Sequence, residues 1–441
     1  MKKKRVERVT PNKGQEEALL QMKKFIKSKS KDIEFCLDGS GGTGKTTIIK
    51  ELFIKQNKEE KEEFYVATNV VGIAVSHKAR LVLSEHLPNS ITYASAVNMT
   101  VEFDRWGEMI FVPKTGIYQQ NKIAKYRYIV FDEASMVSDD MRAILLRCVN
   151  ENAKIIYMGD HCQLPPIKPS VGEYDPDKDG SVFELKNHYT LTEKMRQNED
   201  DYIAKLCDLT REHINSDKDL SWISKIEPLY NKKEKKGYSF TNEENVIRSF
   251  VRNFKDGVDC RIMAYRNARV DHLNARVRHA IFGDKASEKY LPGDLIVGNE
   301  QYAPDQLNNP IFFNGEDMII QNVYDAVVED LYCYEIWVED KDKPLYVVKE
   351  ESMREYYRKL STLKAKALAT KFWSEYVIFR STFANISHGY AITLYKIQGT
   401  TLYGAYVDVS DIMSINVLSN KRKLQSFYVG ISRPTNFLAL F

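Results

Sequence analysis

The sequence predicts an α/β protein with two domains in tandem, each built on a parallel β-sheet covered by helices. Three observations carry this prediction. Short apolar runs alternate with helical patterns, a glycine-rich segment joins one such run to a helix, and the alternation resumes in the second half of the chain. The 441 residues leave room for about three domains, or for two domains with large insertions.

Composition and charge are those of a globular protein. The chain is 43% hydrophobic and 11% aromatic, which is enough to build packed cores and excludes a disordered chain. Lys and Arg number 64 against 61 Asp and Glu, so the net charge is +3 and any nucleic-acid binding must come from a local basic track. No apolar run approaches the roughly 20 residues that span a bilayer. No apolar segment follows the basic residues 1–8, so we expect no secretory signal.

The cysteines are scattered and form no Cys-x-x-Cys pair. We therefore expect neither a disulfide scaffold nor a zinc ribbon, and a reducing cytoplasm suits the chain. His161 and Cys162 are adjacent, and we interpret them as a loop histidine and a small buried thiol rather than a metal site. The six cysteines are Cys36, Cys148, Cys162, Cys207, Cys260 and Cys333.

The first domain begins with a helix and with a strand that runs into a glycine-rich segment. Residues 15–26 place apolar side chains on one helical stripe, which predicts an amphipathic helix. Residues 33–38 are a short apolar run that predicts a strand. The segment 39–46 follows directly, and residues 48–53 then repeat apolar side chains with helical spacing. Strand, glycine loop and helix in this order are the setting that a phosphate-binding loop requires.

The same domain, which we place at residues 1–190, continues with further strands and helices. Strands are predicted at 64–67, 128–131 and 154–158, with a helix at 138–149. Two strand-like runs around a glycine-containing turn, 101–103 and 109–112, predict a small β-hairpin inserted at about 98–122.

The second domain is predicted at 191–284 and 382–441, with a β-rich insertion between its two parts. Its strands are expected at 261–264, 405–409 and 437–441. Strand-like runs in 285–381 predict a small β-barrel-like domain, and the basic segment 353–373 predicts a helical arm. The basic side chains of this arm either form a solvated helix face, which we favour, or lie against DNA. The runs of the insertion are 295–297, 318–320, 335–338 and 345–348.

The segment 39–46 fits the pattern G-x-x-x-x-G-K-[ST]. Its glycines let backbone N–H groups point at phosphate oxygens, and the following helix adds unpaired donors and a favourable dipole. Lys45 would neutralise the β- and γ-phosphates of ATP, and Thr46 would bind Mg²⁺. An accidental glycine-rich turn would lack the flanking strand and helix. The residues that we assign to nucleotide binding here are Gly39, Ser40, Gly41, Gly42, Thr43, Gly44, Lys45, Thr46 and Thr47.

Polar side chains follow the next two expected strands. Asp132 and Glu133 come directly after 128–131, and magnesium prefers oxygen ligands with one or two carboxylates. We assign Asp132 to the metal and Glu133 to the base that orients and deprotonates the attacking water. Two prolines fix the segment 159–166 as a loop at the carboxyl end of the sheet, where Gln163 can reach a γ-phosphate or the water.

The motifs, in this order, resemble those of superfamily 1 helicases. Gln15, 39–46, 132–136 and 159–166 are similar to motifs Q, I, II and III, and 191–196, 388–400 and 428–433 are similar to motifs IV, V and VI. Order and spacing most resemble the RecD-like branch, whose members move 5′ to 3′. The resemblance implies two RecA-like P-loop NTPase domains in tandem, with a β-hairpin in the first and an SH3-like barrel inserted in the second. It also implies ATP and Mg²⁺ as cofactors.

The resemblance implies further residue roles. Gln15 would read the adenine edge, and Arg196 and Arg433 would stabilise charge on the transferring phosphoryl group. Gly399 of motif V would contact the nucleotide. In the family the hairpin acts as a pin that splits the duplex, with an aromatic side chain stacking on a base. The expected nucleic-acid contacts are Thr92, Ser95, Trp106, Phe111, Asn267, Thr393, Tyr395 and Lys396.

Some positions depart from the family pattern. Motif Ia reads Ala67-Thr-Asn69 instead of Ala-Pro-Thr, Ala94 and Tyr395 stand where relatives often have histidine, and Met195 replaces an aromatic residue before Arg196. We therefore expect intact hydrolysis, broader nucleotide selectivity and altered handling of DNA.

Three functions remain open at this point. The first is an ATP-dependent DNA helicase that acts on single-stranded DNA and duplex junctions. The second is a translocase that displaces proteins or remodels RNA, and the third is a non-catalytic scaffold whose nucleotide site gates binding. Retention of Glu133, Arg196 and Arg433 argues against the scaffold. We expect a monomer in the cytoplasm of a bacterial or phage-infected cell, with a single-strand-binding protein or replication and recombination proteins as possible partners.

Overall fold

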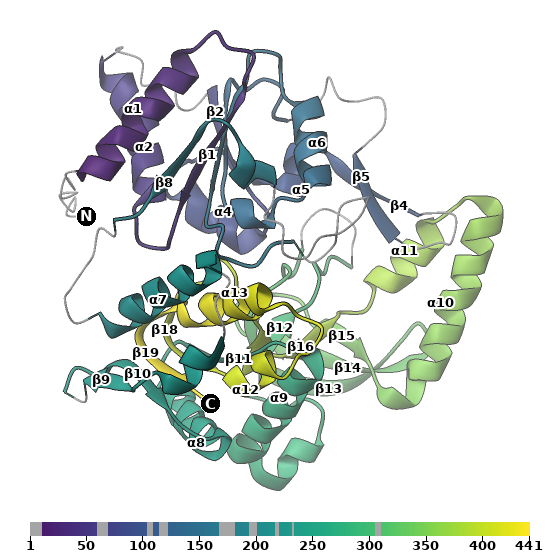
Figure 1. Ribbon diagram of the computed structural model, residues 1–441. Helices are drawn as coiled ribbons and strands as arrows, with labels where there is room; N and C mark the ends of the chain where they lie inside the picture. Colours follow the sequence, from purple (N-terminus) through teal and green to yellow (C-terminus); the bar gives the residue numbers. More distant parts are fainter. Residues whose placement is uncertain are drawn as a thin grey trace, which may run out of the picture. The chain divides into compact units, whose positions relative to one another are not determined.

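The computed structural model divides into two compact units, which are described one at a time (Figure 1). The first unit comprises Met1–Thr100, Val112–Leu220 and Leu418–Tyr428, and the second comprises Val101–Phe111, Ser221–Val417 and Val429–Phe441. The structure describes residues 11–59, 69–103, 109–113, 122–166, 181–193, 201–216, 220–231, 233–304 and 310–441.

A six-stranded parallel sheet forms the centre of the first unit. Its strand order is β3-β2-β6-β7-β1-β8, and every neighbouring pair is parallel. The strands are β1 (Glu34–Gly39), β2 (Val70–Ala74), β3 (Ser90–Thr92), β6 (Tyr128–Phe131), β7 (Lys154–Gly159) and β8 (His188–Leu191). The helices are α1 (Lys13–Lys27), α2 (Lys45–Glu59), α4 (His77–Ser84), α5 (Tyr93–Ala96), α6 (Asp139–Cys148) and α7 (Tyr202–Ser216).

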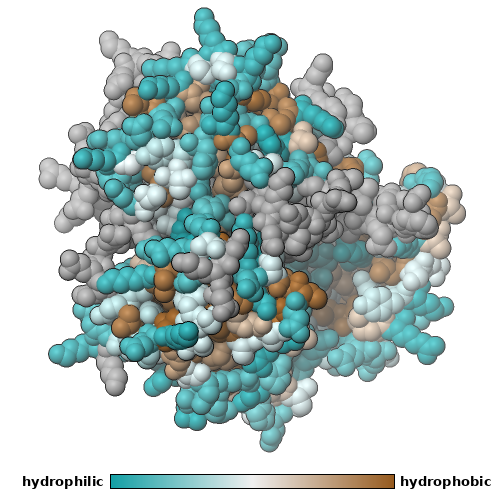
Figure 2. Space-filling model, viewed as in Figure 1, coloured by the Kyte–Doolittle hydropathy of each residue, from teal (hydrophilic) through white to brown (hydrophobic). Residues whose placement is uncertain are grey.

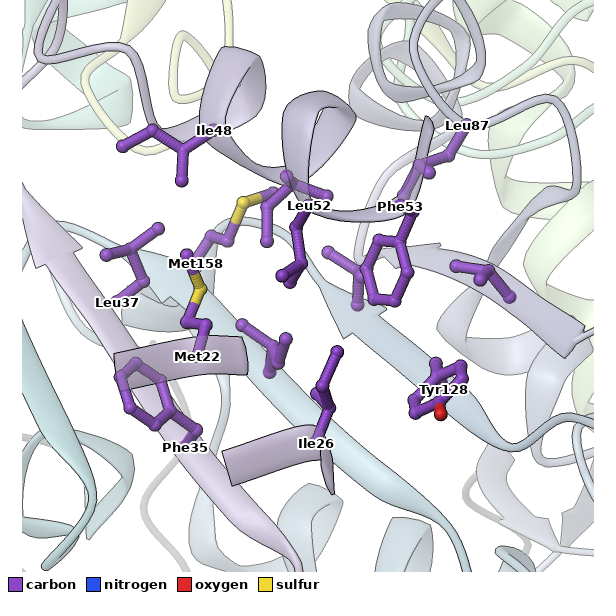
Figure 3. Packing of buried hydrophobic residues seen from close by; sticks show 14 of the residues in the cluster. Met22, Ile26, Phe35, Leu37, Ile48, Leu52, Phe53, Leu87, Tyr128 and Met158 are labelled. Atoms are coloured by element: carbon purple, nitrogen blue, oxygen red, sulfur yellow. The ribbon is translucent and has the colours of Figure 1, made fainter. Parts of the chain in front are cut away.

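Helices cover both faces of this sheet. Alternate residues of a strand point to opposite faces, and the buried side chains accordingly form two clusters. One cluster packs α1, α2 and α4 on the sheet, and Figure 3 shows Met22, Ile26, Leu52 and Phe53 of the first two helices around Met158. The other cluster joins α5 and α6 to the opposite face. The predicted parallel sheet with helices on both faces is confirmed.

The predicted elements of the first unit are largely present. The strands expected at 33–38, 128–131 and 154–158 are β1, β6 and β7, and the helix expected at 138–149 is α6. Ser138 caps this helix by accepting a hydrogen bond from Met141 N–H. The strand expected at 64–67 lies outside the described residues. The predicted hairpin appears as a two-stranded sheet of β4 (Met99–Phe103) and β5 (Met109–Pro113), and its residues 101–111 are assigned to the second unit.

The second unit contains another six-stranded sheet, of order β17-β11-β18-β19-β10-β9. Its pairs are parallel except for β9 with β10. The strands are β9 (Leu229–Asn231), β10 (Lys236–Phe240), β11 (Cys260–Ala264), β17 (Ala391–Thr393), β18 (Leu402–Val407) and β19 (Pro434–Leu440). Helices α8 (Glu243–Lys255) and α9 (Asn267–Phe282) pack on this sheet around the buried rings of Phe250 and Tyr390.

The bounds of two strands in this sheet differ from the prediction, and the strand expected at 437–441 begins at Pro434. The run expected at 405–409 is β18, which begins at Leu402 and ends at Val407. Asp408 instead caps helix α12 (Val409–Met413), because its side chain accepts a hydrogen bond from Asp411 N–H. Because Asp408 forms this cap, the strand ends two residues before the predicted end.

The insertion is an antiparallel sheet of order β15-β14-β13-β12-β16. Ala384 N–H donates to Tyr346 O at 2.7 Å, which links the two edges and makes the sheet barrel-like. The last strand, β16, lies beyond residue 381, where we had expected the insertion to end. The strands are β12 (Leu295–Gly298), β13 (Asp317–Val328), β14 (Leu331–Val338), β15 (Leu345–Val348) and β16 (Ile386–His388).

The predicted basic arm is a helix. Helix α10 (Glu350–Thr370) and helix α11 (Ser374–Ser381) pack on the barrel through Phe379 and Phe383. Several basic side chains of α10 are paired with carboxylates: Arg358 with Glu355, Lys359 with Glu329, and Lys366 with Glu375. These pairs occupy much of the positive charge that a DNA contact would use.

The surface is mostly polar. On the face shown in Figure 2, most of the described surface is hydrophilic, and smaller hydrophobic areas are scattered among the hydrophilic side chains. Among the helices that the structure describes, none combines the length and the hydrophobicity that crossing a bilayer requires.

Candidate active site

The glycine-rich loop lies between the end of β1 at Gly39 and the start of α2 at Lys45. Gly42 and Gly44 have φ angles of 81° and 83°, in the left-handed region where a side chain is strained. Lys45 Nζ donates to Gly39 O at 2.6 Å and to Ser40 O at 3.0 Å. The ammonium group is therefore held against the loop that precedes α2, as a phosphate-binding loop requires.

Gln15 lies against this loop. Its Nε2 donates to Thr43 O at 2.8 Å, its Oε1 accepts from Asn12 N–H at 3.1 Å, and the side chain is 2% exposed. Each end of the amide thus keeps room for at most one further hydrogen bond. The structure gives Gln15 a task that the sequence did not reveal, which is to tie the start of α1 to the phosphate loop.

Asp132 and Glu133 follow β6. Burial raises the pKa of Asp132 above its usual value, while the Glu133 N–H, which donates to Asp132 Oδ1 at 2.9 Å, and the charge of Lys45 act in the opposite direction. Glu133 has φ 57° and ψ 48°, a left-handed conformation that is uncommon for a residue with a side chain. Strain of this kind concentrates at functional sites, which fits the assignment of Glu133 to the reaction.

Gln163 lies in the loop after β7. Its N–H donates to Asp160 O at 3.0 Å. The Asp160 carboxylate is 1% exposed and accepts hydrogen bonds from Arg211 of α7 and, at 2.7 Å, from Tyr428 OH of α13 (Asn420–Ile431). Two helices therefore hold the loop that carries Gln163, a support that no local sequence signal indicated.

The two arginines expected at the phosphoryl group have different outcomes. Arg196 lies outside the described residues. Arg433 belongs to the second unit, in the turn between α13 and β19, where it is 8% exposed and its Nε donates to Val429 O at 3.1 Å. Gly399, also of the second unit, lies in the turn after β17 with φ 73°.

Two of the expected nucleic-acid residues, Thr92 and Ser95, lie at α5 in the first unit. Thr92 caps this helix, since its hydroxyl accepts from Ser95 N–H at 3.3 Å. The Ser95 hydroxyl accepts from Lys122 Nζ at 2.8 Å, so a cation that sequence reasoning missed lies beside it. Trp106 lies outside the described residues, and for Phe111 the structure describes only the backbone, in β5.

In the second unit the structure brings the expected contacts together. The parallel strands β11 and β17 end side by side, with Ala264 opposite Thr393, so Asn267 and Lys396 follow neighbouring strand ends. Asn267 is exposed at the start of α9, and Tyr395 makes an edge contact with Tyr265 at 6.2 Å between ring centres. Lys396 Nζ is exposed and donates to Asn299 Oδ1 at 2.8 Å, a partner that the sequence did not suggest.

Comparisons with known proteins agree with this geometry. A family model described as an AAA domain matches residues 10–227. The ATP-dependent DNA helicase dda of Enterobacteria phage T4 is 26% identical over 458 residues, which cover 95% of this chain and 96% of that protein. An uncharacterized protein, R530, of Acanthamoeba polyphaga mimivirus is 24% identical and covers 94% of this chain and 96% of its own length.

Two further similarities bear on the branch and the fold. The RecBCD enzyme subunit RecD of Buchnera aphidicola (subsp. Schizaphis graminum) is 25% identical over 199 residues, 40% of this chain and 32% of that protein. A solved structure of a Pif1 helicase aligns with a TM-score of 0.51 at 14% identity, covering 98% of this chain and 92% of the other, which shows a shared fold. The motifs and these sequence similarities agree with a resemblance to the RecD-like branch of the superfamily 1 helicases.

Proposed function

We propose that this protein is an ATP-dependent DNA helicase that moves 5′ to 3′ along single-stranded DNA and separates duplex DNA, driven by hydrolysis of Mg-ATP. The observation that carries the proposal is the set of side chains at the carboxyl edge of the first sheet: Lys45 after β1, Asp132 and Glu133 after β6, and Gln163 after β7. Parallel sheets bind ligands at this edge. Similarity to the phage T4 DNA helicase over nearly the whole chain supports DNA as the substrate.

Each of these residues has a role in the proposed reaction. The backbone of the loop and Lys45 would bind the β- and γ-phosphates. Glu133 would orient the attacking water and accept its proton, and Gln163 would contact the γ-phosphate or that water. Arg196 and Arg433 would stabilise the charge that develops on the transferred phosphoryl group.

The donor atoms fit a magnesium ion. Thr46, in the first turn of α2, offers a hydroxyl oxygen, and Asp132, at the end of β6, offers a carboxylate, and Mg²⁺ prefers such oxygen ligands. Burial raises the pKa of Asp132, and a bound cation would favour the charged form of this carboxylate. A bound Mg²⁺ would neutralise phosphate charge, and Thr46 and Asp132 would hold it.

DNA would be held by both units. In the second unit we propose Asn267, Thr393, Tyr395 and Lys396, because they follow two neighbouring strand ends. In the first unit we propose Thr92 and Ser95 near the Lys122 ammonium. Trp106 and Phe111 stay predicted stacking residues of the hairpin.

Domain borders, location and partners complete the proposal. For the domain borders we propose 1–190, 191–284 with 382–441, and 285–381, with two changes: the insertion also takes in β16, and the first domain extends through α7. All six cysteines are free and buried, which suits a reducing compartment, so we propose the cytoplasm of a bacterial or phage-infected cell. We further propose a monomer that acts at duplex junctions, with a single-strand-binding protein or replication and recombination proteins as partners.

The first experiment measures ATP hydrolysis with and without single-stranded DNA, for the wild type and for Lys45→Ala. We expect strong stimulation by DNA and loss of hydrolysis in the variant. Duplexes with either a 5′ or a 3′ single-stranded tail then test the direction, and only the 5′ tail should support unwinding. Hydrolysis that is stimulated by RNA alone would favour RNA remodelling. ATP binding without hydrolysis in the wild type would favour the nucleotide-gated scaffold.

A further inference from the structure

An ion pair within the first unit links the loop of Gln163 to the phosphate-binding loop. His161 Nδ1 lies 2.7 Å from Asp38 Oδ2, and the His161 N–H donates to Asp38 Oδ1 at 3.1 Å. Asp38 is the residue before Gly39, where the phosphate loop begins, and its side chain is 2% exposed. His161 lies two residues before Gln163. His161, in the loop of Gln163, therefore contacts both carboxylate oxygens of Asp38, the residue directly before the phosphate loop.

The contacts of the His161 ring favour its positively charged form. Nδ1 faces the Asp38 carboxylate, and Nε2 lies 2.9 Å from Oδ1 of Asn215 on α7 and 3.3 Å from Sγ of Cys162. Only an imidazolium can donate from both ring nitrogens. Burial is the largest single effect and opposes this charge, but the hydrogen bonds and charges of Asp38 and Cys162 together raise the pKa of His161 to about 11. The same contact lowers the pKa of Asp38, although burial acts in the opposite direction.

The Asp38–His161 pair connects the two loops beyond the point where strand pairing holds them together. Strands β1 and β7 are paired up to Asp38 and Gly159, and beyond this point the two loops separate. At that end, the side chains of Asp38 and His161 connect the two loops. Arg211 of α7 and Tyr428 of α13 bind Asp160, which lies in the same loop as His161. The position of Gln163 relative to the phosphate loop therefore depends on the contacts of Asp160 and on those of His161.

We propose that Asp38 and His161 are positioning residues for ATP hydrolysis: their ion pair sets the place of Gln163 relative to the phosphate-binding loop, and Asn215 extends this link to α7. The inference rests on the proposed function, in which Gln163 contacts the γ-phosphate or the attacking water. Neither Asp38 nor His161 touches the nucleotide in this scheme, so they act through Gln163.

The test compares kcat and KM for ATP, with saturating single-stranded DNA, in His161→Gln, Asp38→Asn and the double variant. A displacement of about 1 Å in an active site can cost roughly a hundredfold in rate. We expect kcat to fall by about ten- to a hundredfold while KM changes by less than about threefold. The double variant should be no slower than the slower single variant, because both changes break one link.

Glu34→Gln is the matched control. Glu34 starts the same strand and forms an ion pair with Arg142 at 2.7 Å, at the opposite end of β1. Thermal unfolding measures the stability of all variants. We expect this control to lose stability as well but to keep kcat within about twofold of wild type, because the link that it breaks is remote from both loops.

The outcomes separate the inference from the proposed function. Wild-type kcat in folded His161→Gln, or independent multiplying effects in the double variant, would overturn the inference while hydrolysis stands. A wild type without hydrolysis would overturn the proposed function itself. If the variants at 38 and 161 do not fold, Asn215→Ala removes the outer, exposed hydrogen bond of the ring together with a long contact to Cys162 Sγ. A kcat at least twofold below wild type would then support the inference, and an unchanged kcat would overturn it.

Discussion

Replacing Arg278, a buried residue of α9, is expected to lower the stability of the second unit strongly. Its guanidinium donates to both oxygens of Asp294, at 2.9 Å for the shortest contacts, and also to the carbonyl oxygens of Ala286 and Glu288. Arg278 is 6% exposed and Asp294 is fully buried. Tyr390 OH, in motif V, donates to the same carboxylate at 2.9 Å. The pair thus ties α9 to the start of the inserted sheet and to motif V.

We predict that Arg278→Met costs about 3–5 kcal/mol of unfolding free energy, because it leaves a buried carboxylate without its cation. For a unit of this size the loss corresponds to a fall in Tm on the order of 10 °C. Urea unfolding of the full chain and a thermal scan measure both quantities. Adding Asp294→Asn should recover part of the loss, since the amide oxygen still accepts from Tyr390 while the unpaired charge is gone.

Arg276→Met is the control on the same helix. Arg276 is 39% exposed and pairs with Glu243 and Glu244, so its loss should cost no more than about 1 kcal/mol. If Arg278→Met costs as little as this control, the reasoning from the buried carboxylate is wrong.

Three further predictions follow from the first unit. Glu133→Gly should lower kcat by about a hundredfold or more without lost stability in urea unfolding, because glycine removes a left-handed strain of about 1 kcal/mol; a clear loss of stability would refute a purely catalytic role. Gln15→Ala should cost about 1–2 kcal/mol of unfolding free energy and raise KM for ATP, because it removes the hydrogen bond to Thr43 O. An unchanged KM in an ATP titration would contradict this. The raised pKa of His161 stabilises the fold fully below its unfolded value near 6.5, and this contribution is lost as pH rises toward about 11. The Tm difference between wild type and His161→Gln should therefore shrink steadily from pH 6 to pH 10, and a difference that grows would refute the ion pair.

Local patterns made part of this site predictable. The strand β1, the glycine loop and α2 are contiguous in sequence, and the apolar run before Asp132 ends where β6 ends. Backbone conformation at Gly42 and Gly44 restricts the residue type directly, so the pattern of glycines carries structural information. Fold class and the positions of Lys45, Asp132 and Gln163 follow from such signals.

Contacts between distant segments were not predictable. Asp38 and His161 are 123 residues apart, and in the sequence His161 is only a loop histidine beside a cysteine. Tyr428 and Asp160 are 268 residues apart. The Asp38–His161 pair forms because the strand order of the sheet brings β1 and β7 together, and the Tyr428–Asp160 pair depends on how α13 packs; no single segment records either arrangement. Gln15 shows the same limit, since its contact with Thr43 depends on how α1 packs.

The two sheets put their polar side chains at corresponding places for one physical reason. The strands β1, β6 and β7 are parallel, and so are β11 and β17, so the residues after each strand gather at the carboxyl edge. In the first unit that edge carries a glycine loop and acidic residues, which suit a phosphate and its metal. In the second unit it carries Asn267, Tyr395 and Lys396, which suit a nucleic-acid backbone and its bases. Loop composition at a shared edge, rather than a difference in fold, therefore separates the proposed ATP-binding and DNA-binding roles.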